Sequence, residues 1–205
     1  MTSGGGYKDG RFHRAYSEGT APWDIGRPQP EIVALAEAGT FGHRVVDLGC
    51  GTGEQALMLA ARGHEVLGID AVPEAVERAR RMAEERGVAA QFIAGDLFEV
   101  LPLLGRSFDS AVDVGLFHTL SDEDRLRFAV ALGRVLVPGG VYVMLCFSDR
   151  VPGEFGPRRV SEAEIRDTFR APAFVVREVR AAGLHSLHAD APVIDANLAF
   201  IERMY

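Results

Sequence analysis

Three glycines and nearby carboxylates stand at spacings in the chain that suit ligand binding. Gly49, Gly51 and Gly53 alternate through the stretch VVDLGCGTGEQA, and without side chains they let a ligand approach the backbone closely. The helix expected directly after them offers unpaired N–H groups and the positive end of its dipole. Asp70 ends the next apolar run, where its carboxylate is suited to accept hydrogen bonds from ribose hydroxyls. The glycine loop and this acid together predict a site for a nucleoside.

The charge around the loop indicates which nucleoside it suits. A dinucleotide-binding fingerprint starting at Gly49 would require Gly or Ala where this chain has Glu54, which is too large for the close helix–strand contact. A carboxylate beside the loop also repels a pyrophosphate, and Asp47, on the strand before the loop, adds a second negative charge. These charges favour a cationic ligand and disfavour an NAD-dependent oxidoreductase.

Alternating strands and helices would position these residues. Short apolar runs predict five buried strands, at 44–49, 65–70, 89–96, 107–115 and 141–148. Pro or Ser at the start and Gly at or near the end mark helices at 28–38, 73–87 and 121–137, and a stop at Gly63 marks a helix at 54–63. Strands that are apolar along their whole length are covered on both faces, which is typical of a mostly parallel α/β sheet.

The C-terminal part has a different pattern. A Gly- and Pro-rich loop precedes a helix capped by Ser161. Two further strands, at 174–183 and 197–204, follow with no helix between them, which predicts an antiparallel hairpin at the sheet edge. We expect a single domain over 21–205, preceded by a flexible leader over 1–20 that orders on ligand binding.

The stretch VVDLGCGTG resembles motif I of class I S-adenosylmethionine-dependent methyltransferases. The resemblance continues at Asp70, at AGDLF (94–98) and at FDSAVDVGLFHTLSDEDR (108–125), and it covers most of the chain. It implies a Rossmann-like α/β fold: a mostly parallel seven-stranded sheet with helices on both faces and a C-terminal antiparallel hairpin. It also implies S-adenosyl-L-methionine as the cofactor.

The same resemblance implies roles for individual residues. The loop glycines would pack on the methionine moiety, Asp70 would bind the ribose hydroxyls, and Asp96 and Leu97 would contact the adenine. The segment after the fourth strand would line the sulfonium pocket. The cofactor-binding set expected in this way is Trp23, Asp47, Gly49, Gly51, Gly53, Asp70, Ala71, Gly95, Asp96, Leu97, Asp113, Val114 and Gly115.

Trp23, the single tryptophan, lies in the proline-rich stretch PWDIGRPQPEI (22–32). This stretch is similar to one in a small-molecule branch that contains thiol, halide, thiopurine and heterocyclic-toxin methyltransferases, where it forms part of the active-site lid. The prolines stiffen the segment, and an indole can cover a sulfonium by cation–π attraction while excluding water. The alternative is that Trp23 is a hydrophobic plug that holds the N-terminal helix against the domain.

The acceptor side is less well marked. Methyl transfer from a sulfonium is an in-line displacement, so the enzyme mainly aligns acceptor, methyl and sulfur. His118, just past the fourth strand, is the candidate catalytic base; the alternative is a hydrogen bond that fixes its loop. Phe12 and Tyr16, like Tyr7 in the same leader, are expected to close over the acceptor. Arg158 would attract an anionic acceptor, or else belongs to a solvated face.

We therefore expect methyl transfer to a small aromatic or heterocyclic molecule, at S, O or N. A second hypothesis is a nucleoside-binding regulator that kept the fold and lost catalysis. A nucleic-acid substrate is disfavoured, because the formal net charge is −7 and the fourth strand is followed by DVGL rather than an NPPY-like tetrapeptide.

Composition sets further limits on the 205-residue chain. No apolar run approaches the roughly 18 residues of a membrane span, and the N-terminus MTSGGGYKDG lacks the apolar core of a signal peptide. We expect a cytoplasmic monomer or homodimer that does not bind membranes. Cys50 and Cys146 are expected to be reduced core residues, and the histidine spacing predicts no metal site.

Overall fold

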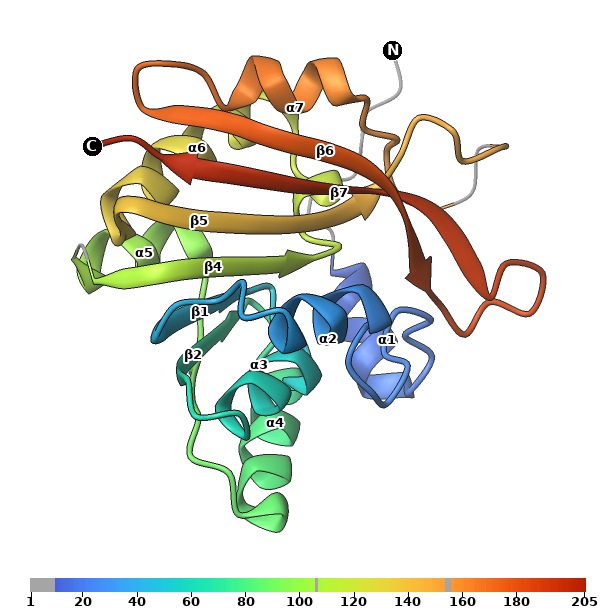
Figure 1. Cartoon of the computed structure of the whole chain (residues 1–205). Helices are drawn as coiled ribbons and strands as arrows, with labels where there is room; N and C mark the ends of the chain where they lie inside the picture. The colour runs from blue at the N-terminus through green and yellow to red at the C-terminus, as the bar shows by residue number, and fades with distance from the viewer. Residues whose placement is uncertain (1–9, 106, 154–155) are drawn as a thin grey trace.

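The computed structural model describes residues 10–105, 107–153 and 156–205. Seven strands form one sheet in the order β3-β2-β1-β4-β5-β7-β6 (Figure 1). The strands are β1 (Arg44–Leu48), β2 (Glu65–Asp70), β3 (Gln91–Ala94), β4 (Phe108–Val114), β5 (Leu136–Phe147), β6 (Phe174–His185) and β7 (Val193–Arg203).

The first five strands pair in parallel and the last two run antiparallel. β1 lies between β2 and β4, which brings the carboxyl ends of these three strands to one edge. β7 pairs antiparallel with both β5 and β6, so the terminal hairpin forms the sheet edge. The predicted fold is confirmed: a mostly parallel seven-stranded sheet with a C-terminal antiparallel hairpin.

Helices cover both faces of the sheet (Figure 1). One face packs on α2, α3 and α4, and the other on α5, α6 and α7. The helices are α1 (Arg11–Glu18), α2 (Pro30–Glu37), α3 (Glu54–Ala60), α4 (Pro73–Arg86), α5 (Leu97–Leu104), α6 (Asp122–Val135) and α7 (Glu162–Thr168), with a short 3-10 turn η1 (Phe117–Thr119).

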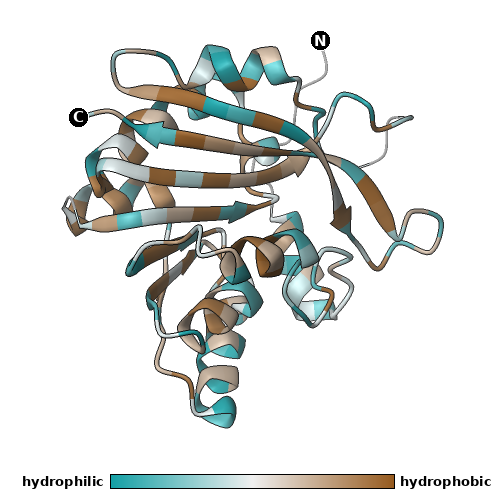
Figure 2. Ribbon diagram, viewed as in Figure 1, coloured by the Kyte–Doolittle hydropathy of each residue, from teal (hydrophilic) through white to brown (hydrophobic). Residues whose placement is uncertain are grey.

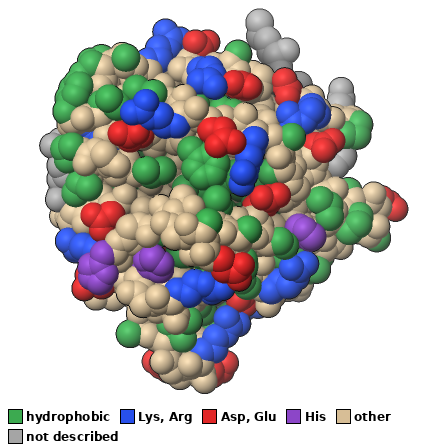
Figure 3. Space-filling view, in the orientation of Figure 1, with side chains coloured by type: hydrophobic (Ala, Val, Ile, Leu, Met, Phe, Trp, Pro, Cys, Tyr) green, Lys and Arg blue, Asp and Glu red, His purple; other side chains and the backbone are tan. Residues whose placement is uncertain are grey.

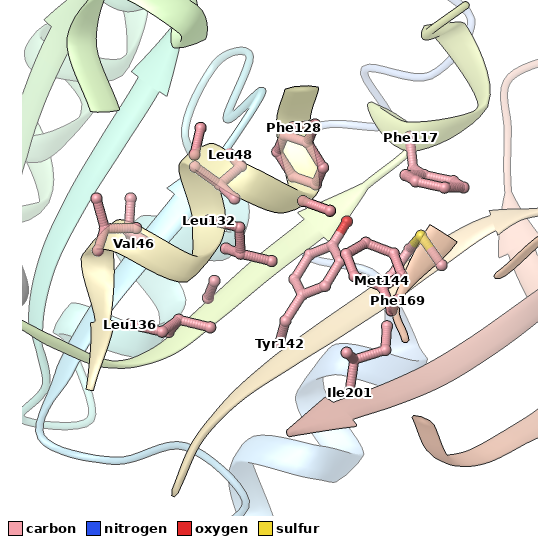
Figure 4. Close-up of a cluster of buried hydrophobic side chains, with 14 of the residues drawn as sticks. Val46, Leu48, Phe117, Phe128, Leu132, Leu136, Tyr142, Met144, Phe169 and Ile201 are labelled. Carbon is pink, nitrogen blue, oxygen red and sulfur yellow. The ribbon is translucent and has the colours of Figure 1, made fainter. Parts of the chain in front are cut away.

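The central strands are apolar because both of their faces are buried. In β5, Tyr142 and Met144 point toward the α6 face, while the alternate residues Val143 and Leu145 pack on the opposite face. In Figure 2 brown segments recur along the strands, between paler and teal ones. Close to α6, the ring of Tyr142 lies 5.7 Å from that of Phe128 (Figure 4). These contacts fix the sheet on which the site is built.

The structure contains two helices that the sequence pattern did not predict. α1 lies inside the segment expected to be a flexible leader, where Tyr16 packs against Val72 and Ala75 near the start of α4. A tertiary contact of this kind leaves no local signal. α5 is capped by Asp96, and the proline within it, Pro102, obscured the helical pattern. Residues 1–9, which include Tyr7, lie outside the described part of the chain.

Both cysteines are free and buried, as predicted. Within the described residues, no helix combines the length and the apolar character that crossing a membrane requires.

Candidate active site

The glycine-rich loop connects β1 to α3 at the carboxyl edge of the sheet. Gly49 and Gly51 have positive φ angles of 69° and 54°, which favour glycine. The Asp70 carboxylate accepts hydrogen bonds from the backbone N–H groups of Gly51, at 2.8 Å, and of Val72, at 2.9 Å. Burial raises the pKa of Asp70, and these two hydrogen bonds partly oppose that effect. Asp70 thus holds the loop against the end of β2.

Each loop glycine is needed for a different close approach. A Cβ at Gly51 would lie 2.5 Å from the hydroxyl oxygen of Tyr16, and one at Gly49 would lie 3.1 Å from the Cβ of Leu116. A Cβ at Gly53 would lie 2.9 Å from the Cβ of Ala79, so this glycine lets the loop pack against α4. Gly49 and Gly51 therefore shape the ligand side of the loop, and Gly53 shapes its rear.

A cavity of about 270 Å³ opens between this loop, the N-terminal helix α1 and the tip of the β6–β7 hairpin. Its walls bring together most of the predicted site residues, which come from segments far apart in the sequence. Those lining it are Phe12, Tyr16, Trp23, Asp47, Gly49, Gly51, Asp70, Ala71, Leu97, Val114, Gly115 and His118.

Three predicted cofactor residues besides Gly53 lie behind the cavity wall. Asp96 caps α5 by accepting a hydrogen bond from the Phe98 N–H at 2.9 Å. A Cβ at Gly95 would lie 2.8 Å from the side chain of Val100, so this glycine allows the chain to enter α5 closely. Asp113 is fully buried beneath the floor of the cavity. In this structure these positions shape the site without facing into it.

Asp113 organises the turn after β4, which lines part of the cavity. It accepts hydrogen bonds from the N–H groups of Leu116 and Phe117, at 2.6 and 3.0 Å, and from the Tyr142 hydroxyl at 2.7 Å. Burial raises its pKa to about 7, and the three hydrogen bonds to Leu116, Tyr142 and Phe117 act in the opposite direction. Its role here is to fix η1, because its carboxylate is engaged by these three donors.

Arg158 also lies away from the cavity, in contrast to the expectation that it meets the acceptor. Its guanidinium pairs with Asp122 of α6 and Glu164 of α7. These ion pairs hold the loop after β5 against the two helices. The sequence showed an arginine near the ligand side, but it did not show that two carboxylates from neighbouring helices engage it.

Asp47 carries the clearest sign of a missing cationic partner. Its side chain is buried, and its Oδ2 atom has no hydrogen-bond partner among the described residues. Burial, followed by the charge of Asp113, raises the pKa of Asp47 to about 8. A buried carboxylate oxygen without a donor is unfavourable, and a ligand cation placed in the cavity would relieve it. The residues present therefore fit a cofactor with a positively charged group.

His118 is buried at the end of η1 and is held by one fixed hydrogen bond. Its Nδ1 atom accepts from the backbone N–H of Phe147 at 3.0 Å, so the neutral ring carries its proton on Nε2. Burial, followed by the charges of Arg125 and Arg11, lowers its pKa to about 3. The lone pair that a base would use is thus already engaged. This arrangement favours the alternative, a hydrogen bond that fixes the loop, over the role of a general base.

Trp23 forms part of the cavity wall. Its indole N–H donates to the Tyr16 hydroxyl at 2.9 Å, and its ring meets those of Phe12 and Tyr16 edge-on. The side chain is 38% exposed, which is more than expected for a plug in a core. Its position is that of a cover over the cavity. The neighbouring Asp24 accepts a hydrogen bond from Thr52 of the glycine loop at 2.9 Å.

Several cavity residues were not predicted because they come from the far end of the chain. Phe147 ends β5, and Leu184, Ser186 and Ile194 lie at the tip of the β6–β7 hairpin, which extends past the other strands toward α1 (Figure 1). Gln29 is 1% exposed and lies in the stretch 22–32, which we call the Trp23 segment. Its side chain joins this segment to the hairpin tip. No local motif marks these positions. Only the length of the last two strands, β6 and β7, could have indicated that the hairpin reaches the cavity.

We refer to the contact of the Gln29 side chain with the backbone of His185 as the amide clamp. The Gln29 amide nitrogen donates to the His185 carbonyl at 3.0 Å, and its Oε1 accepts from the His185 N–H at 2.8 Å. Nearby, the Pro22 carbonyl accepts from the N–H of Leu187 at 2.8 Å. These bonds tie the Trp23 segment to the hairpin tip.

Comparison with known proteins shows which sequences and structures this chain is similar to. A family model described as "Methyltransferase domain" matches residues 45–140, from β1 into β5. A 2-heptyl-1-hydroxyquinolin-4(1H)-one methyltransferase from Mycobacteroides abscessus is 40% identical over 149 residues, which are 71% of this chain and 65% of that protein. The match thus spans slightly less than two thirds of this relative. A structure solved for the conversion of a disulfide bond into a thioacetal group during echinomycin biosynthesis is 31% identical, covers 93% of this chain and 89% of its own, and has a TM-score of 0.82.

The chain belongs to the methyltransferase family. The structure of 1,6-didemethyltoxoflavin-N1-methyltransferase from Burkholderia thailandensis, with bound 1,6-didemethyltoxoflavin and S-adenosylhomocysteine, has the same fold. It is 20% identical, covers 95% of this chain and 86% of its own, and has a TM-score of 0.77. The predicted family and its cofactor, S-adenosylmethionine, are confirmed at the level of the family. Within the described residues there is no group of three or more His, Cys, Asp or Glu side chains that could hold a metal ion.

Proposed function

We propose that the protein transfers a methyl group from S-adenosylmethionine to a small aromatic or heterocyclic molecule, at a sulfur, oxygen or nitrogen atom. The observation that carries this proposal is one cavity with a chemically mixed lining. The orphaned Oδ2 atom of Asp47 lies by the glycine loop. Aromatic and aliphatic side chains make up much of the remaining wall, and we propose that they form a separate, apolar end.

The polar end is suited to hold the cofactor. Asp47 would face its positively charged methionine end, and Asp70 its ribose hydroxyls. Leu97 and Phe98, at the start of α5, would flank the adenine. When bound, S-adenosylmethionine supplies a methyl group on a cationic sulfur, ready for in-line displacement.

The apolar end is suited to align an acceptor and to exclude water. Phe12, Trp23 and Phe147 contribute aromatic rings, and Leu184 and Ile194 contribute aliphatic surface from the hairpin tip. Flat aromatic walls favour a flat ligand. Holding two reactants in line is the main catalytic contribution that such a reaction requires. The proposed role of this chain is therefore positioning in a dry pocket.

The test is methyl transfer from S-adenosylmethionine with a deuterated methyl group to a panel of aryl thiols, hydroxyquinolines and N-heterocycles. The proposal expects at least one product with the labelled methyl group by mass spectrometry. It also expects that Asp70→Ala, which removes the loop's anchor, abolishes the product. Cofactor binding without transfer to any panel member would favour the non-catalytic regulator instead.

We further propose that the protein acts in the cytoplasm as a monomer or homodimer on a free small molecule rather than on nucleic acid. Arg side chains are interspersed with Asp and Glu on the face shown in Figure 3, without a continuous basic surface there. The net charge of −7 also opposes binding to phosphates. Sedimentation of the protein with and without duplex DNA tests both the oligomeric state and this exclusion.

A further inference from the structure

We propose that His118 is a fixed hydrogen-bond donor that selects an acceptor bound as an anion, such as an acidic aryl or heteroaryl hydroxyl or thiol. This inference rests on the proposed function and assigns an acceptor class to the same site. It replaces a general base with a donor whose proton stays on the ring. Its support comes from the hydrogen bond at Nδ1, the open space before Nε2 and the cations around the imidazole.

The tautomer is set by the sheet. The N–H of Phe147 belongs to β5, and it donates to Nδ1 of His118 at 3.0 Å. A backbone N–H held in a strand cannot reverse its role, so Nδ1 must keep its lone pair and Nε2 must carry the hydrogen. The ring of Phe147 packs edge-on against the imidazole, with centroids 4.7 Å apart, and limits its rotation. The donor direction is therefore fixed before any ligand binds.

The Nε2–H donor of His118 is open to the cavity. Within the described residues, no hydrogen bond to Nε2 is formed, and His118 lines the cavity. A Cβ at Gly115 would lie 3.5 Å from Nε2, so a larger residue there would occupy the approach to it. Gly115 also has a φ of 84°, which few other residues adopt. The glycine thus keeps the N–H accessible from the cavity.

The charges that act on the imidazole are both positive. Arg125 from α6 and Arg11 from α1 disfavour a second proton on the ring. Arg125 is 2% exposed, and its Nε and Nη2 atoms have no hydrogen-bond partner among the described residues. Its guanidinium lies 4.7 Å from the ring centroid of Phe117, and the contact with Glu164 at 3.4 Å, together with the charge of Asp122, offsets its charge in part. A neutral donor backed by two cations favours an anionic ligand over a neutral or cationic one.

The reaction then needs no proton transfer inside the cavity. The acceptor's O–H or S–H loses its proton to the solvent before binding. A lone pair of the resulting anion forms the bond to the methyl carbon while the methyl–sulfur bond breaks, and its electron pair stays on sulfur. An anion and a sulfonium give two neutral products. The hydrogen bond from His118 holds the anion in place, and the proton on Nε2 remains there throughout.

The experiment compares three proteins saturated with S-adenosylhomocysteine, which cannot react: wild type, His118→Gln and His118→Met. Glutamine and methionine have nearly the same length, and neither places an atom where Nδ1 stands in the imidazole ring, so both variants lose the hydrogen bond from Phe147 in its present geometry. Only glutamine keeps an N–H donor. The probe is 4-nitrophenol, whose anion has its own absorbance band, titrated at pH values below and above its pKa.

Wild type should bind the anion about tenfold or more tightly than the neutral phenol, because hydrogen bonds to charged groups are the strong ones. His118→Gln should keep most of this preference, and His118→Met should lose it. Equal preferences in the two variants, or a wild type that prefers the neutral phenol or binds neither form, would overturn the inference. Calorimetry of S-adenosylhomocysteine binding in the same samples separates this outcome from a failure of the proposed function, in which the cofactor product itself would not bind.

Discussion

At the scale of single residues, two buried carboxylates on neighbouring strands differ in their hydrogen bonding. Asp113 receives hydrogen bonds from three donors and shapes the turn after β4. Asp47 keeps one oxygen without a donor and lies at the cavity. Both stand in apolar strands, and the sequence assigned both to the cofactor. The distinction depends on hydrogen-bond partners that come from β5 and η1, which a local pattern does not contain.

We predict that Asp47 makes cofactor binding depend on pH. Burial raises its pKa to about 8, so the free protein holds this carboxyl protonated near neutral pH. A cation beside the carboxylate favours its charged form, so binding expels the proton. Affinity for S-adenosylmethionine should therefore rise with pH from about pH 6 to about pH 8. Calorimetry in buffers of different ionisation enthalpy measures both the affinity and the released proton.

Asp47→Asn supplies the control for this prediction. The variant should bind S-adenosylmethionine about tenfold or more weakly and release no proton. Its stability should also change: because the folded pKa of Asp47 lies above the unfolded value, the native state binds more protons between about pH 4 and about pH 8, and wild-type stability falls with rising pH there. That part of the decline should be absent in the variant. An unchanged affinity would contradict the assignment of Asp47.

The glycine loop gives a second residue-scale prediction, with a matched pair of variants. Gly51→Ala and Gly63→Ala both place a Cβ at a positive φ, of 54° and 93°. Each should lose about 1–2 kcal/mol of stability through backbone strain. Only the Cβ at Gly51 also meets Tyr16, at 2.5 Å, since at Gly63 nothing among the described residues lies within 4 Å.

The affinity for S-adenosylhomocysteine should therefore fall about tenfold or more in Gly51→Ala alone, because the loop and α1 must move apart to make room for the alanine side chain. Calorimetry measures the affinity, and urea unfolding measures the stability. Equal affinities in the two variants would mean that the contact between Tyr16 and the loop does not shape the site.

At the scale of elements, the amide clamp couples the Trp23 segment to the β6–β7 hairpin. The side-chain amide of Gln29 bonds the hairpin through both its nitrogen and its oxygen, while the backbone N–H of Gln29 donates to the side chain of Gln55 in α3 at 2.8 Å. One residue thus links a hairpin that lines the acceptor end, through its side chain, to the helix that follows the glycine loop, through its backbone. The Trp23 segment is thus bonded on one side to the glycine loop and on the other to the hairpin tip.

We predict that loosening the clamp affects the acceptor more than the cofactor. Gln29→Met leaves the N–H and carbonyl of His185 without partners and should cost about 1–3 kcal/mol of stability. The KM for the acceptor should rise about tenfold, while the affinity for S-adenosylhomocysteine should change by less than about threefold, because the substitution frees the hairpin but leaves the bond from the Gln29 backbone N–H to α3 intact. Gln29→Glu, which keeps one of the two bonds, should fall between. Steady-state kinetics and calorimetry check both values, and equal losses for the two ligands would refute a role confined to the acceptor.

The elements also show how far sequence patterns reach. Apolar runs bounded by glycine and proline predicted every strand of the sheet, because strands buried on both faces have a strong and continuous signal. They did not predict α1, whose face is defined by its contact with α4, or α5, which contains Pro102. At the site, the cofactor end was predicted from a local motif. The acceptor end was predicted only in part, because Leu184, Ile194 and Phe147 reach it through the topology of β5, β6 and β7.

At the scale of the whole molecule, the cavity joins the parallel part of the sheet to the antiparallel hairpin. Its walls come from α1, the Trp23 segment, the carboxyl edge of the parallel strands and the hairpin tip. A ligand that fills the cavity would contact all of them at once. Binding should therefore stabilise the fold as a whole and should order the N-terminal segment against the domain.

We predict that S-adenosylhomocysteine at about one hundred times its dissociation constant raises the midpoint of thermal unfolding by about 5–10 °C. A ligand that binds only the native state contributes about 2.7 kcal/mol at that concentration, and each kcal/mol shifts the midpoint by about 2–4 °C in a domain of this size. Differential scanning calorimetry measures the shift. Asp47→Asn at the same ligand concentration should show a clearly smaller one, and an equal shift would point to binding elsewhere.

The central claim is that the cofactor occupies the cavity whose wall includes Trp23, and the fluorescence of this single tryptophan tests it most directly. Titration with S-adenosylhomocysteine should change the emission of Trp23 along a saturable curve, because its indole lies against Tyr16 at the cavity wall. The dissociation constant from that curve should equal the one from calorimetry. Heat without a fluorescence change would place the ligand away from Trp23, and the absence of both would contradict the account.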